Sequence, residues 1–317
     1  MRILVTGAAG FIGSNTAELL LELGHDVVGL DNLTSGRADN VPKEAVFIHG
    51  DFGDTDLVRS LGRFDACVHF AAYIQPGESM KIPEVFFDNN VASTFRLLSG
   101  LIDVGVPRFV FSSSCAVYGD QVTMPIDEDH PTSPQSPYGA SKLMVEQGLS
   151  WLSKQGRINS ASLRYFNAAG GTSKHPERHN PELHLIPLAF QTVIGQRPKL
   201  EIFGDDYPTP DGTCIRDYVH VSDLALAHAQ AINALSQYSS LTLNLGTGVG
   251  SSNREVVETV RVVTGSDFNV EFVARRPGDP AAAVANGVRA SQLLGWHPER
   301  SDLATIVSDA WAAFCAV

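Results

Sequence analysis

The sequence has little cysteine, no long apolar run and no excess of positive charge. Its 4 cysteines are scattered over 317 residues without a CxxC pair or a metal-ligand spacing, so we expect reduced thiols and a cytoplasmic location. No segment reaches the length of a transmembrane helix and no apolar leader follows Met1, so we expect neither a membrane partner nor a signal peptide. The formal net charge of -12 argues against a nucleic-acid partner.

The first half of the chain alternates short apolar segments with helical patterns. We interpret as strands the segments 2–7, 25–31, 45–51, 65–72 and 108–114, and as helices 11–24 and 85–105. Such alternation predicts an α/β fold built on a Rossmann-type doubly wound parallel sheet. We expect a first domain over 1–166, joined by parts of 213–250. The shorter elements of 167–317, separated by Gly and Pro, predict a smaller α/β part that is mainly substrate-binding.

A glycine-rich segment, TGAAGFIG, links the first predicted strand to the first predicted helix. Gly7 permits a tight turn, Gly10 lets a diphosphate approach the backbone, and Gly13 lets the helix pack against the strand. The second strand ends in Asp31, 18 positions after Gly13. A carboxylate there accepts hydrogen bonds from ribose hydroxyls and repels a 2′-phosphate, which predicts NAD as cofactor. Asp51 ends the third strand and either meets the adenine or serves as a turn or capping acid.

A second glycine-rich segment, NLGTGVGSSN at 244–253, also stands between a predicted strand and a predicted helix. No strand ending in an acid follows it at the distance that a dinucleotide site requires. We therefore expect a tight turn in the second part of the chain, with a second nucleotide site as the minor alternative.

The segment SPYGASK places a Tyr four residues before a Lys. Ser136 and Pro137 suit the N-cap and first position of a helix, so Tyr138 and Lys142 fall on one face of its first turns. A nearby ammonium, together with an oxidised nicotinamide, favours the phenolate and makes Tyr138 a base for a sugar hydroxyl. Ser114 ends the strand RFVFSSS, where ligands bind in open α/β sheets, and its hydroxyl can hold the same substrate oxygen. Alone, the Tyr–Lys pair would be an ordinary helix surface.

The chain resembles the extended short-chain dehydrogenase/reductase family over nearly its whole length. The segments that carry the resemblance are TGAAGFIG, DNLTSG, GDF, HFAA, GES, DNNV, FSSSCAVYGD, PQSPYGASKLMVEQ, LRYFNAAG, IFGDDYPTPDGTCIRDYVHVSDLA and NLGTGVG. They are most similar to the branch of the family that epimerises UDP-hexoses at C4 through a transient 4-keto sugar. The resemblance implies an NAD-dependent isomerase with Tyr138 as base, Lys142 as the cation that tunes it and contacts the nicotinamide ribose, and Ser114 as a helper at O4.

The resemblance also implies two sets of binding residues. The residues that fall on cofactor-contacting positions are Gly7, Gly10, Phe11, Ile12, Gly13, Asp31, Asn32, Leu33, Ser35, Gly36, Asp51, Phe52, Phe70, Ala71, Ala72, Ile74, Asn89, Ser112, Tyr138, Lys142, Tyr165 and Phe166. Those that fall on UDP-sugar-contacting positions are Ser114, Tyr138, Asn167, His184, Leu185, Glu201, Ile202, Phe203, Arg216, Arg276, Asp279 and Ala283. The two arginines suit a diphosphate by their own chemistry.

Three positions depart from the pattern of the family. Ile74 replaces a Lys near the cofactor diphosphate, and His184 replaces an Asn that can contact the nucleotide sugar. Ala283 aligns with a position that often holds a bulky Tyr, which predicts room for an N-acetyl group and hence turnover of UDP-N-acetylhexosamines. We expect no metal at His175, His179 and His184, because neither a Cys nor a paired acid joins them and the chemistry needs none.

Other functions stay open at this point. A 4-epimerase of UDP-xylose/arabinose or of UDP-glucuronate has the same requirements. A nucleotide-sugar 4,6-dehydratase is disfavoured because Cys115 and Ala116, which follow Ser114, cannot supply its extra acid and base. A non-catalytic NAD-binding module is disfavoured because it has no use for a tuned base. Apolar residues on more than one face of 85–105 and 138–154 predict a homodimer built on a helix bundle, or deeper burial of both helices.

Overall fold

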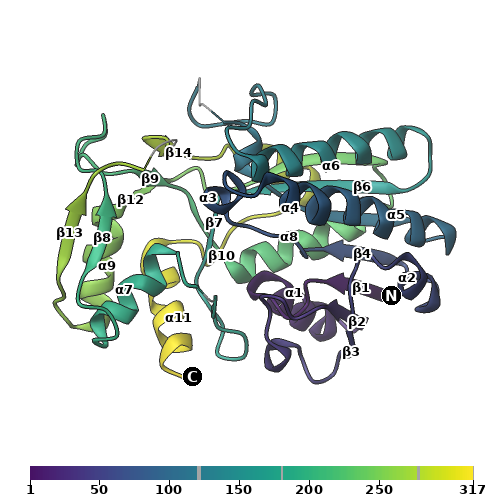
Figure 1. Ribbon diagram of the computed structural model, residues 1–317, viewed down its shortest axis with the longest axis horizontal. Helices are drawn as coiled ribbons and strands as arrows, with labels where there is room; N and C mark the ends of the chain where they lie inside the picture. Colours follow the sequence, from purple (N-terminus) through teal and green to yellow (C-terminus); the bar gives the residue numbers. More distant parts are fainter. Residues whose placement is uncertain (120–122, 180, 277–278, 317) are drawn as a thin grey trace.

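The computed structural model describes residues 1–119, 123–179, 181–276 and 279–316. In these ranges the central element is a seven-stranded parallel sheet in the order β11-β6-β5-β4-β1-β2-β3 (Figure 1). Its strands are β1 (Arg2–Thr6), β2 (Asp26–Asp31), β3 (Val46–His49), β4 (Ala66–His69), β5 (Arg108–Ser114), β6 (Asn159–Tyr165) and β11 (Ser240–Leu245). The predicted fold class is confirmed.

Helices cover both faces of the sheet, which explains why its strands are apolar throughout. One face packs against α1 (Phe11–Glu22), α8 (Val221–Ala234) and α10 (Val288–Leu294), and the other against α2 (Thr55–Ser60), α5 (Ser93–Asp103) and α6 (Pro137–Lys154). Along β1, Ile3 and Val5 enter the first core and Leu4 enters the second. The side chains thus alternate between two buried layers.

Strand β1 lies between β4 and β2, so the chain winds away from it in both directions. The carboxyl ends of β1 and β4 therefore form the topological switch point of the sheet. In open α/β sheets the crevice outside these strand ends is where ligands bind.

A second group of elements lies beside the sheet around its own core (Figure 1). It comprises α7 (Leu185–Val193), α9 (Asn253–Thr264), α11 (Leu303–Cys315), β8 (Leu200–Phe203) and β13 (Val270–Val273). Between it and the sheet are the pair β7 (Asn167–Ala169) with β10 (Tyr218–His220), and the trio β12 (Ser251–Ser252), β9 (Ile215–Arg216) and β14 (Ala282–Ala283). Although both come from the second half of the sequence, β11 is a strand of the large sheet and α8 packs against its face. The predicted division of the chain into two domains near residue 166 stays a prediction.

The predicted helix over 85–105 is not one regular helix. The chain forms α4 (Pro83–Phe87), a π-helical turn (Asp88–Ala92) and then α5. In the π turn, the Asn90 side chain accepts a hydrogen bond from Tyr73 N at 2.9 Å and donates to the Tyr73 carbonyl at 3.0 Å. Such π turns are frequent at functional sites because they redirect side chains, a feature that helical periodicity cannot predict.

Short elements complete the described chain. They are the helix α3 (Pro76–Ser79) and the 3-10 turns at Ala38–Asn40 and Cys115–Val117. Within the described ranges, no helix combines the length and the apolar character needed to span a bilayer.

Candidate active site

The start of α6 places the Tyr138 phenol at the carboxyl edge of the sheet. Ser136 is the N-cap, its Oγ accepting a hydrogen bond from Gly139 N at 3.2 Å, and Pro137 is the first helical residue. Both roles were predicted from SPYGASK. Tyr138 N donates to Ser79 Oγ of α3 at 3.1 Å, which ties the first turn to a neighbouring segment. The Tyr138 side chain is 9% exposed.

Lys142 and Ser114 meet Tyr138 from two sides. Lys142 Nζ donates to the Ser112 carbonyl on β5 at 2.8 Å and lies 5.8 Å from the centre of the Tyr138 ring. The Ser114 hydroxyl, at the end of the same strand, lies close enough to the Tyr138 phenol to interact with it, and it accepts a hydrogen bond from Ala116 N at 3.2 Å. The three residues predicted to be catalytic are thus brought together.

The protein alone does not lower the pKa of Tyr138. Burial raises this pKa to about 12, and the nearby Ser114 hydroxyl only partly opposes the shift. Burial also lowers the pKa of Lys142 to about 7, against the attraction of Glu146 one turn further on. Lys142 alone does not offset the desolvation of the phenol, and because the expected tuning includes the charge of an oxidised nicotinamide, that expectation stays a prediction. Any lowering of the Tyr138 pKa must therefore come from positive charge that a bound ligand adds.

Behind Lys142 lies a buried polar network that the sequence did not suggest. Arg164 on β6 donates through Nε to Glu146 Oε1 at 2.9 Å and through Nη2 to Oε2 at 2.5 Å, with both side chains under 10% exposed. Ser113 Oγ donates to the same Glu146 Oε1 at 2.5 Å. The network continues from Arg164 Nη1 to the Tyr118 hydroxyl at 3.0 Å. The network joins α6, β5 and β6, and its Glu146 lies one turn after Lys142 on α6.

The glycine-rich turn after β1 has the cramped geometry of a dinucleotide site. Gly7 has φ +72°, and a Cβ on it would lie 2.6 Å from Ala71 N. A Cβ on Gly13 would lie 2.1 Å from the Gly7 carbonyl oxygen, so the helix packs against the turn without side chains between them. No side chain caps α1 at Gly10, which leaves the N–H groups of its first turn to an anionic acceptor. These residues suit the diphosphate of NAD.

The carboxylate of Asp31 is held beside this turn. Its Oδ2 accepts from Ala9 N at 3.0 Å and its Oδ1 from Leu33 N at 2.8 Å. The orientation, at the end of β2 next to β1, suits the hydroxyls of an adenosine ribose. Asp51 accepts from Gly53 N at 2.7 Å and from Asn32 Nδ2 at 3.2 Å, so it serves as a turn acid at the same edge.

Nearly all of the predicted cofactor residues follow or end one of six neighbouring parallel strands, and therefore share one edge of the sheet. Grouped by strand from β1 to β6 they are Gly7, Gly10, Phe11, Ile12 and Gly13; Asp31, Asn32, Leu33, Ser35 and Gly36; Asp51 and Phe52; Phe70, Ala71, Ala72 and Ile74; Ser112; and Tyr165 and Phe166. Asn89 lies in the π turn, where its Nδ2 donates to Asn90 Oδ1 at 2.9 Å.

Three predicted substrate residues, Arg216, Asp279 and Ala283, come together at β9, and two more, Arg276 and Phe203, contact each other. Arg216 Nη1 donates to the Pro280 carbonyl at 2.9 Å, and its Nη2 lies 3.9 Å from Asp279 Oδ1. Ala283 is the register partner of Arg216. The Arg276 guanidinium carbon lies 3.8 Å from the centre of the Phe203 ring.

The other predicted substrate residues lie on β7, β8 and the start of α7. On β8, Ile202 is 1% exposed and belongs to the core of the second group of elements, because alternate residues of the strand face inward. A ligand contact from its side chain is therefore excluded. Glu201 pairs with Lys199 at 3.4 Å. Asn167 donates from its backbone N to the Asp217 carbonyl at 3.0 Å, and Leu185 begins α7.

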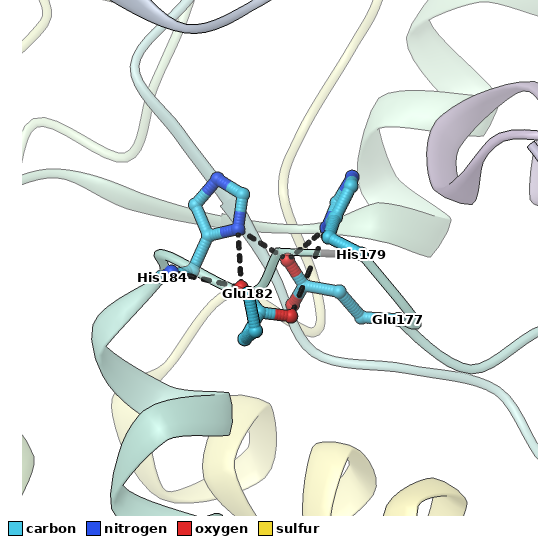
Figure 2. A group of neighbouring side chains, drawn as sticks. All are labelled: Glu177, His179, Glu182 and His184. Atoms are coloured by element: carbon cyan, nitrogen blue, oxygen red, sulfur yellow. Dashed lines mark hydrogen bonds and ion pairs between the residues drawn. The ribbon is translucent and has the colours of Figure 1, made fainter. Parts of the chain in front are cut away.

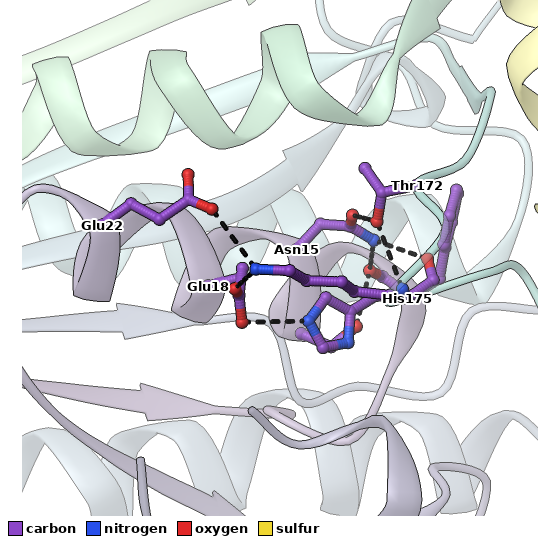
Figure 3. A network of polar contacts seen from close by, with 8 residues as sticks. Asn15, Glu18, Glu22, Thr172 and His175 are labelled. Carbon is purple, nitrogen blue, oxygen red and sulfur yellow. Dashed lines mark hydrogen bonds and ion pairs between the residues drawn. The ribbon is translucent and has the colours of Figure 1, made fainter. Parts of the chain in front are cut away.

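The expectation that no acid joins the histidines of the loop before α7 is wrong. His179 Nδ1 lies 3.1 Å and His184 Nδ1 2.9 Å from Glu177 Oε1, and Glu182 is the second acid of the group (Figure 2). His175 turns away and contacts Glu18 of α1 at 3.3 Å (Figure 3). The contact predicted for His184 with a nucleotide sugar thus competes with its two carboxylate partners. In the sequence, the repeated Glu-x-His spacing at 177–179 and 182–184 was the pattern that could have indicated this group of acids and histidines.

The second glycine-rich segment is a turn clamped by a buried acid, as the sequence indicated. Asp217 Oδ1 accepts from the N and Oγ1 of Thr247 at 2.9 and 2.7 Å, and Oδ2 accepts from Gly248 N and Ala285 N at 3.1 Å. The turn's N–H groups are therefore used within the protein. Sequence reasoning missed Asp217, although it directly follows Arg216 in the motif TCIRDY.

Comparisons with known proteins agree with this geometry. Residues 3–246 match the profile of the NAD dependent epimerase/dehydratase family. The chain is 48% identical to a UDP-glucose 4-epimerase of Streptomyces lividans, over 98% of this chain and 95% of that protein. A UDP-glucose 4-epimerase structure from Stenotrophomonas maltophila, with NAD and formylated UDP-arabinopyranose bound, superposes with a TM-score of 0.96 at 40% identity, covering 100% and 98% of the two chains. The UDP-Glc/GlcNAc 4-epimerase of Campylobacter jejuni superposes with a TM-score of 0.86 at 38% identity, covering 98% of each chain.

Proposed function

The chain belongs to the NAD dependent epimerase/dehydratase family, and on this premise we propose that it interconverts UDP-glucose and UDP-galactose by epimerising the hexose at C4. The observation that carries the proposal is the buried group of Ser114, Tyr138 and Lys142 at the sheet edge that also holds the glycine-rich turn and Asp31. Tyr138, which can accept a proton from a hydroxyl, and the dinucleotide site therefore lie at the same edge of the sheet, near the switch point.

The chain's own residues carry the proton and position the sugar. Tyr138 takes the proton of the O4 hydroxyl as the C4 hydride leaves, and Ser114 hydrogen-bonds to the same oxygen. NAD, held by the glycine-rich turn and Asp31, would accept the hydride and return it, and its oxidised nicotinamide would add positive charge near the phenol, whose pKa burial raises. The resulting 4-keto sugar rotates, and its C4 regains the hydride on the opposite face while Tyr138 returns the proton to O4. Lys142, held by the Ser112 carbonyl, adds positive charge beside the ring.

We propose Arg216 and Arg276 as the residues that hold the UDP diphosphate while the sugar turns over. Both guanidinium groups come from segments that meet near β9, and Arg216 is oriented by the Pro280 carbonyl and Asp279. Guanidinium groups form paired hydrogen bonds to phosphate oxygens, which keeps the nucleotide in place during the reaction. Asn167 and Leu185 are proposed to complete this wall.

A panel of UDP-sugars tests the proposal. The purified protein, without added NAD, is incubated with UDP-glucose, UDP-galactose, UDP-arabinopyranose, UDP-glucuronate and UDP-N-acetylglucosamine, and the products are separated by chromatography. We expect the incubation that starts from UDP-glucose and the one that starts from UDP-galactose to reach the same mixture of the two UDP-sugars. Conversion of a UDP-pentose or UDP-glucuronate alone would replace this function with one of the alternative epimerases.

Ala283 is proposed to admit UDP-N-acetylhexosamines, because it is the register partner of Arg216 and its side chain is only a methyl group. Replacing Ala283 with Tyr should put a bulky ring at this position and lower turnover of UDP-N-acetylglucosamine, relative to UDP-glucose, by roughly 10-fold or more. The control is Ala282→Tyr, whose side chain leaves the opposite face of β14 and should keep the ratio unchanged. No turnover of UDP-N-acetylglucosamine by the wild type would refute the role of Ala283.

A 4,6-dehydratase is a weaker candidate. The residues after Ser114 are Cys115 and Ala116, and burial raises the pKa of the Cys115 thiol to about 11. A neutral thiol and a methyl group cannot remove and donate the protons that elimination of water requires.

We further propose that the protein is a cytoplasmic homodimer that associates through α4, α5 and α6. Four free thiols support the location. Val85, Phe95, Met144 and Trp151 are exposed on these helices and form a candidate apolar interface, whereas Phe86, Leu97, Leu98 and Leu149 are buried within the subunit. Light scattering tests the dimer, and Trp151→Glu should shift it toward a monomer.

A further inference from the structure

Four potential metal ligands converge in the loop between β7 and α7. Glu177, His179, Glu182 and His184 each offer one oxygen or nitrogen, and these atoms all lie within 4.8 Å of one another (Figure 2). The carboxylate side chains are 8% and 6% exposed, while the imidazoles are partly open to solvent. Apart from the contact predicted between His184 and a nucleotide sugar, the proposed epimerisation assigns no role to this group.

The two buried carboxylates of this cluster favour the binding of a cation. Within the described ranges, the ion-pair partners of Glu177 and Glu182 are His179 and His184, with no Lys or Arg among them. Unless both imidazoles carry a proton, the two carboxylates keep at least one uncompensated negative charge in a largely buried place, which is costly. Charging both imidazoles would put two cations side by side, since their ring centres are 4.9 Å apart. One divalent ion neutralises the carboxylates and leaves both imidazoles neutral.

The spacing of the donor atoms suits tetrahedral coordination. His179 Nδ1 lies 3.1 Å from Glu177 Oε1 and 3.9 Å from Glu182 Oε2, while His184 Nδ1 lies 2.9 and 3.0 Å from Glu177 Oε1 and Glu182 Oε1. Zinc bonds of about 2.0–2.2 Å give a tetrahedron with edges of roughly 3.4 Å. These four separations lie on both sides of that edge, and all the donor atoms lie within 4.8 Å of one another, so side-chain rotations would complete the site.

We propose that Glu177, His179, Glu182 and His184 form a binding site for a divalent transition-metal ion, with Zn²⁺ as the best match. Two imidazole nitrogens with two carboxylates favour Zn²⁺ over Mg²⁺, which prefers six oxygen ligands. A cavity of about 300 Å³, lined in part by Glu177, His179 and Glu182, gives the ion a route from solvent.

The ion has a structural consequence for the loop. Residues before and within the cluster dock on α1, the helix that begins at the glycine-rich turn. Asn15 Nδ2 donates to the His175 carbonyl at 3.0 Å and Thr172 Oγ1 donates to Asn15 Oδ1 at 2.8 Å (Figure 3). Arg178 pairs with Asp39 at 3.2 Å, and the His179 ring meets the Phe11 ring edge-on at 6.4 Å. A bound ion therefore holds together the loop that lies against this helix.

The test uses the full chain without an affinity tag, stripped with a chelator and then titrated with Zn²⁺. We expect about one Zn²⁺ per chain by elemental analysis, and at least 10-fold weaker binding for His179→Gln and for Glu177→Gln. The matched control is His175→Gln in the same loop, which should bind Zn²⁺ as the wild type does. Addition of Zn²⁺ should also slow hydrogen exchange over 172–184 in the wild type and the control, but not in His179→Gln.

A second readout keeps the test informative if a variant folds poorly. Co²⁺ bound by the wild type should show the intense visible absorption of a tetrahedral nitrogen–oxygen site, and Zn²⁺ should displace it. The proposal is overturned if the stripped wild type takes up no Zn²⁺, if His179→Gln binds as tightly as the wild type, or if His175→Gln loses the ion to the same extent. A six-coordinate Co²⁺ spectrum would equally contradict the four-ligand site.

Discussion

Replacing Tyr138 with Phe is expected to lower kcat for epimerisation by about 10²- to 10⁴-fold, the range that a general acid–base group contributes. The change removes one oxygen atom and leaves the ring that lies near Lys142. NAD should stay bound, because the glycine-rich turn and Asp31 are untouched. Steady-state kinetics with UDP-galactose and release of NAD on denaturation measure the two properties separately.

The control for this experiment is Tyr238→Phe, an identical change at an exposed residue just before β11. It should leave kcat unchanged. Turnover of Tyr138→Phe at the wild-type rate would refute its assignment as the base, and loss of NAD together with activity would point to a structural role instead.

Replacing Arg164 with Met is expected to lower the free energy of unfolding by about 3–5 kcal/mol, because it leaves the buried Glu146 carboxylate without its bidentate partner. The effect is large because breaking one half of a buried ion pair strands the other charge. Denaturant titration of the variant and the wild type measures the change.

Two further variants separate this cause from a simple loss of packing. Arg59→Met removes a half-exposed ion pair with Asp103 and should cost less than about 1 kcal/mol. The double variant Glu146→Leu with Arg164→Met removes both charges and should recover much of the lost stability. A double variant less stable than Arg164→Met would show that the charge pair is not the cause.

The part of the site that was predicted from sequence depends on local rules. Ser136, Pro137, Tyr138 and Lys142 lie within one helix start, and a helix start is set by capping and by the period of 3.6 residues. The glycine-rich turn and Asp31 were predictable for the same reason, since a parallel βαβ unit places them at fixed distances along the chain.

What the sequence left hidden depends on contacts between distant segments. Arg164 and Glu146 are 18 residues apart on a strand and a helix, and only the packing of α6 against β6 brings them together. The raised pKa of Tyr138 was not predicted because desolvation depends on the whole surrounding fold. Glu177 and Glu182 were missed although the Glu-x-His spacing repeats at 177–179 and 182–184, because a loop without periodicity does not show that the two pairs face each other.

The most direct test of the central claim follows the hydrogen at C4. UDP-glucose carrying deuterium at C4 is incubated with the protein in ordinary water, without added NAD, and the UDP-galactose formed is analysed by mass spectrometry and NMR. Transfer of the hydride to a retained cofactor and back predicts that the product keeps its deuterium at C4. Loss of the deuterium to solvent would contradict the account.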